Sequence, residues 1–173
     1  MADEIERKYL LNTQQAETVM ALLQDKGIVP KSIRQGYLHD TLPVVRMRIV
    51  DNAKALMTIK GARRGLTVPE HQWYVPLSEG QSILSDMCSS RLSKKRYEYP
   101  LPGTELVAEI DFFEGPLSGL AMVEVEFDTE EHAREFRPTV EWIAQAQEVT
   151  TDLAYSNLEL ARRACKNAQN KPH

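Results

Sequence analysis

The sequence predicts an α+β fold in which most of the chain forms antiparallel β-strands. Segment after segment carries charged residues at positions i and i+2 with apolar residues between them, which is the period of a strand with one polar and one apolar face. Turn-forming pairs such as Asp51-Asn52 and Gly115-Pro116 separate these segments. Apolar residues at helical spacing are confined to a few stretches, so we expect helices to flank a sheet.

The first part of the chain is expected to hold five strands and one long helix. Asn12 caps the helix and Gly27 ends it. The segments 44–50 and 55–60 alternate strictly around a turn and are predicted to form a hairpin. Pro69 confines the fifth strand to a sheet edge or a bulge, because proline has no amide hydrogen. The predicted strands are residues 4–10, 32–38, 44–50, 55–60 and 66–75.

The second part is expected to hold three strands and several helices. Ser78 and Gln81 resemble a capping box at the start of a short helix. Another short helix is predicted for residues 129–136. A last helix is predicted to start at residues 150–152 and to turn Leu153 toward the body of the protein. One predicted strand begins at residue 94, and the other two cover residues 106–112 and 120–127.

Length and composition predict one soluble domain. The chain has 173 residues, 42% hydrophobic and 27% charged, and we expect a single domain over 1–165 with a polar tail over 166–173. A net charge of −4 argues against a nucleic-acid surface, and no apolar run reaches the roughly 18 residues of a membrane span. Cys88 and Cys165 lack metal-ligand spacing, and no signal core precedes the first strand. We therefore expect a cytoplasmic protein with reduced thiols.

Two sets of charged side chains of opposite sign recur on the strands. A sheet with one packed face and one solvated face explains any single strand. Nearly every strand, however, carries two charged residues at positions i and i+2, which favours a barrel whose charged faces line the inside. Water, divalent cations and a polyanion would be the partners of these charged side chains. Periodicity alone leaves open which face is inside. The basic set is Lys8, Arg46, Arg48, Lys60, Lys94 and Arg96, and the acidic set is Glu4, Glu6, Glu70, Glu109, Asp111, Glu124 and Glu126.

The order of these motifs resembles the CYTH superfamily, also called the triphosphate tunnel metalloenzymes. The matching motifs are E-x-E-x-K at residues 4–8, QGYL at 35–38, R-x-R at 46–48, TIKG at 58–61, K-x-RY at 94–97, E-x-D at 109–111 and E-x-E at 124–126. The likeness runs along almost the whole chain. It implies an eight-stranded antiparallel closed β-barrel, the triphosphate tunnel, with flanking helices and a C-terminal helix.

The resemblance also implies a role for each charged residue. The triphosphate would be bound by Lys8, Arg46, Arg48, Lys60, Lys94 and Arg96. Mg²⁺ or Mn²⁺ would be bound, directly or through water, by Glu4, Glu6, Glu109, Glu124 and Glu126. Catalytic roles fall to Lys8, Glu70 and Asp111, and Glu109 and Asp111 would also orient the basic residues or shape a second metal site.

One departure from the family pattern concerns the strand around Glu70. Such proteins usually carry E-x-E there, and this chain has Glu70-His71-Gln72. An amide offers an oxygen but no negative charge, so we expect weaker metal binding on this side of the tunnel.

The favoured function is a divalent-metal-dependent hydrolase of inorganic triphosphate (tripolyphosphate), a small-molecule substrate, acting as a monomer or homodimer. One alternative is a class IV-type adenylate cyclase, in which a ribose oxygen replaces water as the nucleophile. A nucleoside or thiamine triphosphatase is another. A polyphosphate-binding module without turnover is the alternative outside the enzymes, and all of these remain open from the sequence.

Overall fold

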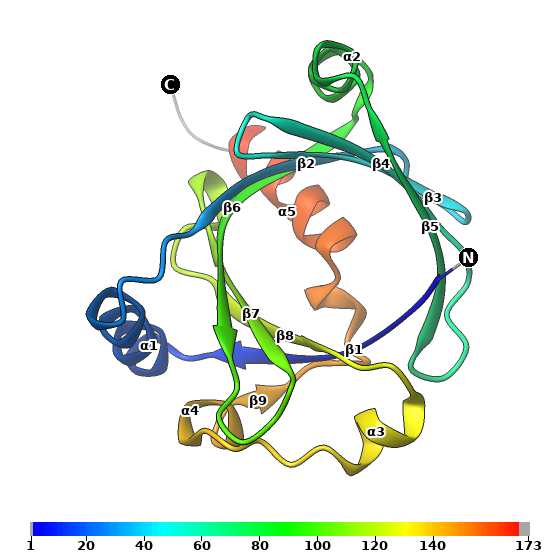
Figure 1. The fold of residues 1–173 in the computed structure, drawn as a ribbon. Coiled ribbons are helices and arrows are strands. Elements are labelled where there is room, and N and C mark those ends of the chain that lie inside the picture. The colour runs from blue at the N-terminus through cyan, green and yellow to red at the C-terminus, as the bar shows by residue number, and fades with distance from the viewer. Residues whose placement is uncertain (1, 170–173) are drawn as a thin grey trace.

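The computed structural model describes residues 2–169, and its strands close into a barrel (Figure 1). The strand order is β5-β4-β3-β2-β6-β7-β8-β1-β9, and β1 also pairs with β5, which closes the ring. All pairings are antiparallel. The predicted eight-stranded antiparallel barrel with flanking helices is therefore confirmed.

The elements have the following bounds. The strands are β1 Ala2–Leu11, β2 Lys31–His39, β3 Val44–Val50, β4 Lys54–Lys60, β5 Thr67–Val75, β6 Ser90–Pro100, β7 Val107–Phe113, β8 Ala121–Glu126 and β9 Gln147–Glu148. The α-helices are α1 Thr13–Asp25, α2 Leu77–Ser82, α3 Glu130–Glu135, α4 Glu141–Ala144 and α5 Asn157–Gln169. A π-helical turn η1 Ile83–Met87 extends α2, and two 3₁₀ turns are η2 Gly115–Leu117 and η3 Leu153–Tyr155.

Local sequence signals explain the first half of the fold. The side chain of Asn12 accepts a hydrogen bond from the backbone N–H of Gln15 at 2.9 Å, and the Gln15 side chain accepts from the backbone N–H of Asn12, which forms a capping box at the start of α1. Asp51 and Asn52 both have positive φ, near 52°, as a tight hairpin turn between β3 and β4 requires. The predicted hairpin is thus present.

In the second half, the helix predicted for residues 129–136 is present as α3 with Thr129 as its N-cap, but two other predicted helix starts were wrong. Pro76 precedes α2 and no side chain caps this helix, so Ser78 and Gln81 form no capping box. The last helix begins at Asn157 instead of residues 150–152, because the turn η3 comes first. This turn leaves Leu153 73% exposed, away from the core. Helix α5 continues to Gln169, so residues 166–169 of the expected tail are helical and residues 170–173 lie outside the described residues.

Three features depend on long-range strand pairing. Strand β9 was not predicted, because two residues carry no periodicity; it pairs with Tyr9 and Leu10 of β1, beyond the part of β1 that pairs with β5. Strand β6 begins at Ser90, four residues before its predicted start. Strand β5 is no edge, since β4 and β1 lie on its two sides, and the carbonyl of Pro69 accepts a hydrogen bond from the Gly61 N–H at 2.9 Å.

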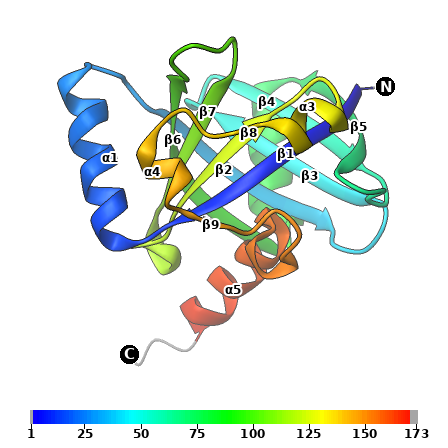
Figure 2. The same ribbon diagram turned by 90° about the horizontal axis from the view of Figure 1, so that it is seen from below.

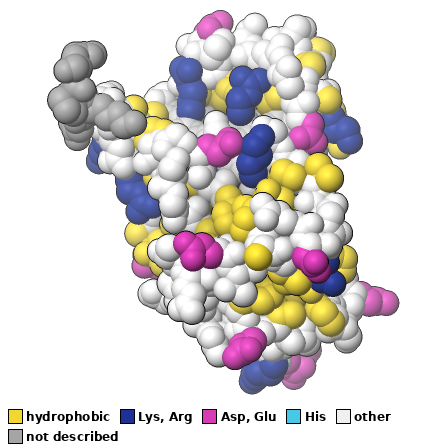
Figure 3. All heavy atoms as spheres, turned by 90° about the vertical axis from the view of Figure 1, so that its left-hand side faces the viewer, with side chains coloured by type: hydrophobic (Ala, Val, Ile, Leu, Met, Phe, Trp, Pro, Cys, Tyr) yellow, Lys and Arg dark blue, Asp and Glu magenta, His cyan; other side chains and the backbone are white. Residues whose placement is uncertain are grey.

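The apolar faces of the strands lie outside the barrel, under the helices. Helices α1, α3 and α4 cover the outer face of β1, β7 and β8, and α2 with η1 covers β3 and β4. Helix α5 lies across one end of the barrel (Figure 2). On the side that carries α1, charges of both signs are scattered between hydrophobic atoms (Figure 3). Among the described helices, none combines the length and apolarity that a membrane crossing needs.

Candidate active site

The charged faces of the strands point into the barrel. Directly paired residues share a face, and the register places Lys8 opposite Glu124, and Glu124 opposite Glu109. The neighbouring apolar residues belong to the outer clusters. The open question of which face is inside is thereby answered. The structure brings together all the residues predicted for the site: Glu4, Glu6, Lys8, Arg46, Arg48, Lys60, Glu70, Lys94, Arg96, Glu109, Asp111, Glu124 and Glu126. Their roles in binding and catalysis remain predictions.

Lys94, Arg96, Asp111 and Glu124 form a buried ion-pair cluster, which we call the β6–β8 network. Arg96 donates to both oxygens of Asp111 at 2.7 and 2.6 Å, and to Glu124 Oε2 at 2.6 Å. Lys94 donates to Asp111 Oδ2 at 2.5 Å. Burial alone would raise the pKa of Glu124, but the cations around it hold this pKa well below its usual range. Glu109 also accepts from Arg96, at the edge of the network.

Two further lysines are paired with carboxylates. Lys8 Nζ lies 3.0 Å from Glu124 Oε1 and 2.9 Å from Glu6 Oε1. Burial would lower the pKa of Lys8, but these two carboxylates raise it above its ordinary value. Lys60 donates to Glu4 and lies 2.9 Å from Glu70 Oε2, a contact without hydrogen-bond alignment. These cations are already neutralised within the protein.

The two arginines of β3, Arg46 and Arg48, are different: we call them the β3 arginines. Within residues 2–169 neither makes an ion pair with a carboxylate. Arg46 is only 4% exposed; it donates to Thr58 Oγ1 at 3.1 Å, and its Nε has no partner. Arg48 donates to the neutral Gln35 Oε1 at 3.2 Å. Burial, and then the charges of Arg46 and Arg96, lower the pKa of Arg48 to about 10. Two such cations inside a protein call for an anion.

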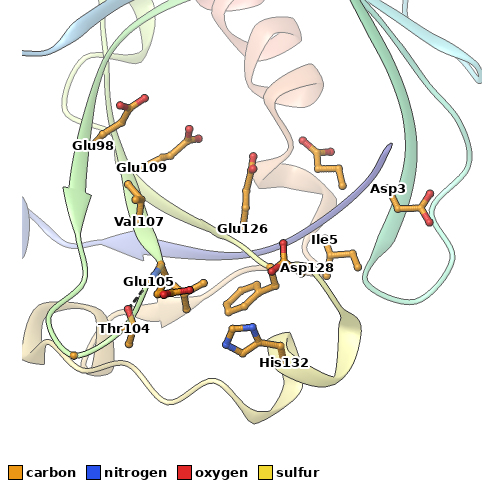
Figure 4. Close-up of a pocket in the computed structure, with 14 residues that line it drawn as sticks. Asp3, Ile5, Glu98, Thr104, Glu105, Val107, Glu109, Glu126, Asp128 and His132 are labelled. Atoms are coloured by element: carbon orange, nitrogen blue, oxygen red, sulfur yellow. Dashed lines mark hydrogen bonds between the residues drawn. The ribbon is translucent and has the colours of Figure 1, made fainter. Parts of the chain in front are cut away.

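Carboxylates gather at the end of the barrel opposite α5, where Glu109 is paired with Arg96 and Glu98 with Lys31, but Glu126 makes no ion pair within residues 2–169. Glu109 and Glu126 point into a pocket of about 940 Å³, whose rim also carries Glu98, Glu105 and Asp128 (Figure 4). Burial, and then the carboxylates of Glu109, Glu4, Glu6 and Glu124, raise the pKa of Glu126 to about 7. A divalent cation would relieve this repulsion.

The oxygen donors fit a divalent cation that shares its coordination with a substrate. Among the residues that the structure describes, no three carboxyl, imidazole or thiol groups form a ready metal cage, because several of the carboxylates are turned toward Lys8 and Arg96. Mg²⁺ is commonly bound by one or two carboxylates together with water and substrate phosphates. Glu126, with its carboxylate neighbours, offers such donors.

Four polar residues of the interior escaped the sequence-based site prediction. Gln35 and Tyr37 are buried on the face of the β3 arginines, and Gln35 Nε2 donates to the Tyr37 hydroxyl at 3.1 Å. Burial raises the pKa of this hydroxyl. Gln35 and Tyr37 alternate on one predicted strand, so the sequence pattern could have placed both on the polar face. Thr58 lies opposite Arg46 and belongs to the TIKG motif, and Asn157 enters from α5 at the end of residues 155–157, which also resemble a family motif; the motifs contain both residues without giving either a role.

Gln72, which replaces the usual glutamate, lies on the inward face of β5. It sits opposite Thr58 and accepts a hydrogen bond from the Thr58 hydroxyl at 3.1 Å. His71 points outward and contacts Trp73, with ring centroids 5.9 Å apart. The register therefore places Gln72 near Arg46, where it is exposed and lines a pocket that Glu98 and Glu109 also line.

Comparisons with known proteins agree with this architecture. The chain matches the CYTH domain over residues 2–165. An inorganic triphosphatase of Acetivibrio thermocellus is 31% identical over 169 residues, which cover 96% of this chain and 98% of the relative. An inorganic triphosphatase of Nitrosomonas europaea is 33% identical over 159 residues, or 91% and 96% of the two chains. The crystal structure of an inorganic triphosphatase superposes with a TM-score of 0.61 at 32% identity, covering 93% of this chain and 95% of that chain.

Proposed function

The chain belongs to the CYTH domain family, and from this premise we propose that it is a divalent-metal-dependent hydrolase of inorganic triphosphate. Relatives named inorganic triphosphatases are similar over nearly its full length. The observation that carries the proposal is the pair of β3 arginines, cations without an anionic partner in the described structure, inside a barrel that also crowds Glu126 with other carboxylates. A complex of triphosphate and metal supplies both missing charges.

In this proposal the β3 arginines bind phosphate oxygens that no carboxylate competes for. Arginine suits this role because its planar fork of donors matches phosphate oxygens. Lys8, Lys60, Lys94 and Arg96 exchange part of their contact with carboxylates for contact with phosphate. Asp111 is 1% exposed and fully engaged by Lys94 and Arg96, so its contribution is to orient these two cations.

The reaction is attack of water on a terminal phosphorus, with cleavage of the phosphoanhydride bond to give phosphate and pyrophosphate. Phosphoryl transfer depends chiefly on positioning and on neutralisation of charge. When bound, Mg²⁺ or Mn²⁺ supplies charge neutralisation on the phosphate oxygens. Glu4, Glu6, Glu109, Glu124 and Glu126 are the proposed ligands of the metal. Lys8 and Glu70 are the residues proposed to act near the reacting phosphate.

We also propose a cytoplasmic location. Cys88 and Cys165 are free thiols, which supports a reducing compartment. Burial raises the pKa of Cys88 to about 11, so this thiol is poorly reactive.

The test is hydrolysis of tripolyphosphate with Mg²⁺ or Mn²⁺, measured as phosphate and pyrophosphate released, with ATP as a second substrate. We expect release from tripolyphosphate that stops when the metal is chelated. Activity that survives exhaustive chelation would contradict the metal requirement. Cyclic AMP as the main product from ATP would instead indicate a cyclase. Binding of tripolyphosphate with no product would indicate a binding module.

A further inference from the structure

Asn157, the first residue of α5, reaches from the end of the barrel into the β6–β8 network. Its Oδ1 accepts a hydrogen bond from Lys94 Nζ at 3.1 Å, and its Nδ2 donates to Glu124 Oε1 at 3.3 Å. The residue thus bridges a proposed phosphate-binding cation and a proposed metal-binding carboxylate. We propose that Asn157 is a positioning residue that fixes Lys94 and Glu124 in the geometry that triphosphate binding requires. This inference rests on the proposed function.

The chemistry of the two partners explains why an amide suits this position. An ammonium group only donates and a carboxylate only accepts, so the bridging side chain must accept on one side and donate on the other. A carboxamide does both without adding charge to the interior. The two partners also fix its orientation, with the oxygen toward Lys94 and the nitrogen toward Glu124.

The bridge matters most for Lys94, which has few other partners. Its side chain is fully buried, and its ammonium contacts Asp111 Oδ2 at 2.5 Å and lies 5.5 Å from the centroid of the Phe113 ring. Asn157 is therefore one of two hydrogen-bond acceptors around this ammonium in the described structure. Without it, Asp111 would be the one remaining hydrogen-bond acceptor around this ammonium within residues 2–169.

The side chain of Asn157 is not needed to begin its own helix, because Ser156 caps it. The Oγ of Ser156 accepts from the Glu159 N–H at 3.2 Å, and its carbonyl accepts from the Leu160 N–H at 2.9 Å. Buried Leu160 and Ala161 pack the helix against the barrel. Different side chains therefore hold α5 and position Lys94, which makes the two roles separable by mutation.

The segment before α5 also holds β1, the strand next to β8. Val149 N–H donates to the carbonyl of Lys8 at 2.8 Å, and Lys8 N–H donates to Thr150 Oγ1 at 3.1 Å. Lys8 in turn contacts Glu124 Oε1, the oxygen that Asn157 contacts. Residues 149–157 therefore fix Glu124 from two directions.

The experiment compares Asn157→Ala, Asn157→Asp and the matched control Ser156→Ala. Binding of tripolyphosphate is measured by calorimetry in the presence of a chelator, and kcat and KM are measured with Mg²⁺. Loss of a residue that orients a ligand-binding group typically costs 10- to 100-fold, so we expect that loss in affinity and in kcat/KM for Asn157→Ala. Asn157→Asp should lose more, since its carboxylate would face that of Glu124. Ser156→Ala should keep both values within twofold while melting at a lower temperature than Asn157→Ala.

Two results would overturn the inference. In the first, folded Asn157→Ala binds and turns over tripolyphosphate within twofold of the unaltered protein. In the second, Ser156→Ala loses as much affinity as Asn157→Ala, which would mean that the residue only holds the helix. If Asn157→Asp fails to fold, Asn157→Ala decides alone. If the unaltered protein neither binds nor hydrolyses tripolyphosphate, the proposed function itself fails, a result distinct from any behaviour of the variants.

Discussion

Arg96 on β6 and the β3 arginines point into the same barrel, yet their electrostatic states are opposite. Arg96 donates to three carboxylates, and their charges raise its pKa well above the ordinary value despite burial. Arg48 has only a neutral amide, and its pKa is lowered. The first arginine is part of the scaffold before any ligand arrives; the second stays costly until an anion binds. Inward orientation alone therefore does not define a ligand-binding residue.

The largest expected effect is that of Arg96→Ala on stability. The change leaves Asp111, Glu109 and Glu124 without their shared cation, and removal of one partner of a buried ion pair costs about 3–5 kcal/mol. For a chain of this size, the melting temperature should fall by roughly 10 °C. Thermal unfolding of the ligand-free protein, followed by circular dichroism, measures this. An unchanged melting temperature would show that the β6–β8 network is not a scaffold.

Arg48→Ala should show the reverse pattern. It removes a cation that repels Arg46 but also a hydrogen bond to Gln35, and because these two effects oppose each other, the ligand-free melting temperature should change by no more than about 2 °C. A hydrogen bond to a charged group contributes about 1.5–3 kcal/mol, so kcat/KM for tripolyphosphate should fall by about 10- to 100-fold. Steady-state kinetics and thermal unfolding of the same preparation test both statements. Lower stability with intact kinetics would assign Arg48 to the scaffold.

Two carboxylates of β8 differ in the same way as the arginines: cations lower the pKa of Glu124, whereas burial and other carboxylates raise the pKa of Glu126. The pKa of Glu126 is raised to about 7, above its value in the unfolded chain, so between about pH 4.5 and 7 the folded state binds more protons. Its contribution to stability is therefore present at low pH and is lost as pH rises through 7. We expect the difference in melting temperature, Glu126→Gln minus the unaltered protein, to become more positive between pH 5 and pH 7.5 when both proteins are measured in chelator. Parallel curves would show that Glu126 is not crowded by other carboxylates.

The smallest expected effect concerns Gln72→Glu, which brings a carboxylate toward the β3 arginines. Gln72 contacts Thr58, which contacts Arg46, so the new charge would compete with phosphate for this cation. At an exposed position the interaction is worth at most about 1 kcal/mol, or roughly a fivefold rise in KM for tripolyphosphate. The metal concentration for half-maximal activity should fall. His71→Glu is the matched control, since it adds the same charge to the outward face of β5. Equal effects of the two changes would show that position on the inward face is irrelevant.

The sequence by itself determined the local elements and the chemical inventory. Alternation at period two located the strands from residue 4 to residue 127, and Asn12, Gly27 and Asp51-Asn52 located a helix and a hairpin turn. These signals are local, since capping and turn formation involve residues three or four positions apart. The basic and acidic sets read from the strands also contained every charged residue that we assign to the site, and the structure places all of them inside the barrel.

Only the tertiary structure decided which face is inside and which charges find partners. A strand with two faces has the same periodicity whether its charged face meets water or lines a barrel, so closure between β1 and β5 had to settle the matter. The register then places Arg96 beside Glu124, 28 positions along the chain, and leaves Arg46 beside an uncharged threonine. The entry of Asn157 between Lys94 and Glu124 depends on where α5 docks. The contacts of Arg96 with Glu124 and of Asn157 with Lys94 and Glu124 join residues 28 to 63 positions apart, which only pairing and packing of the barrel bring together.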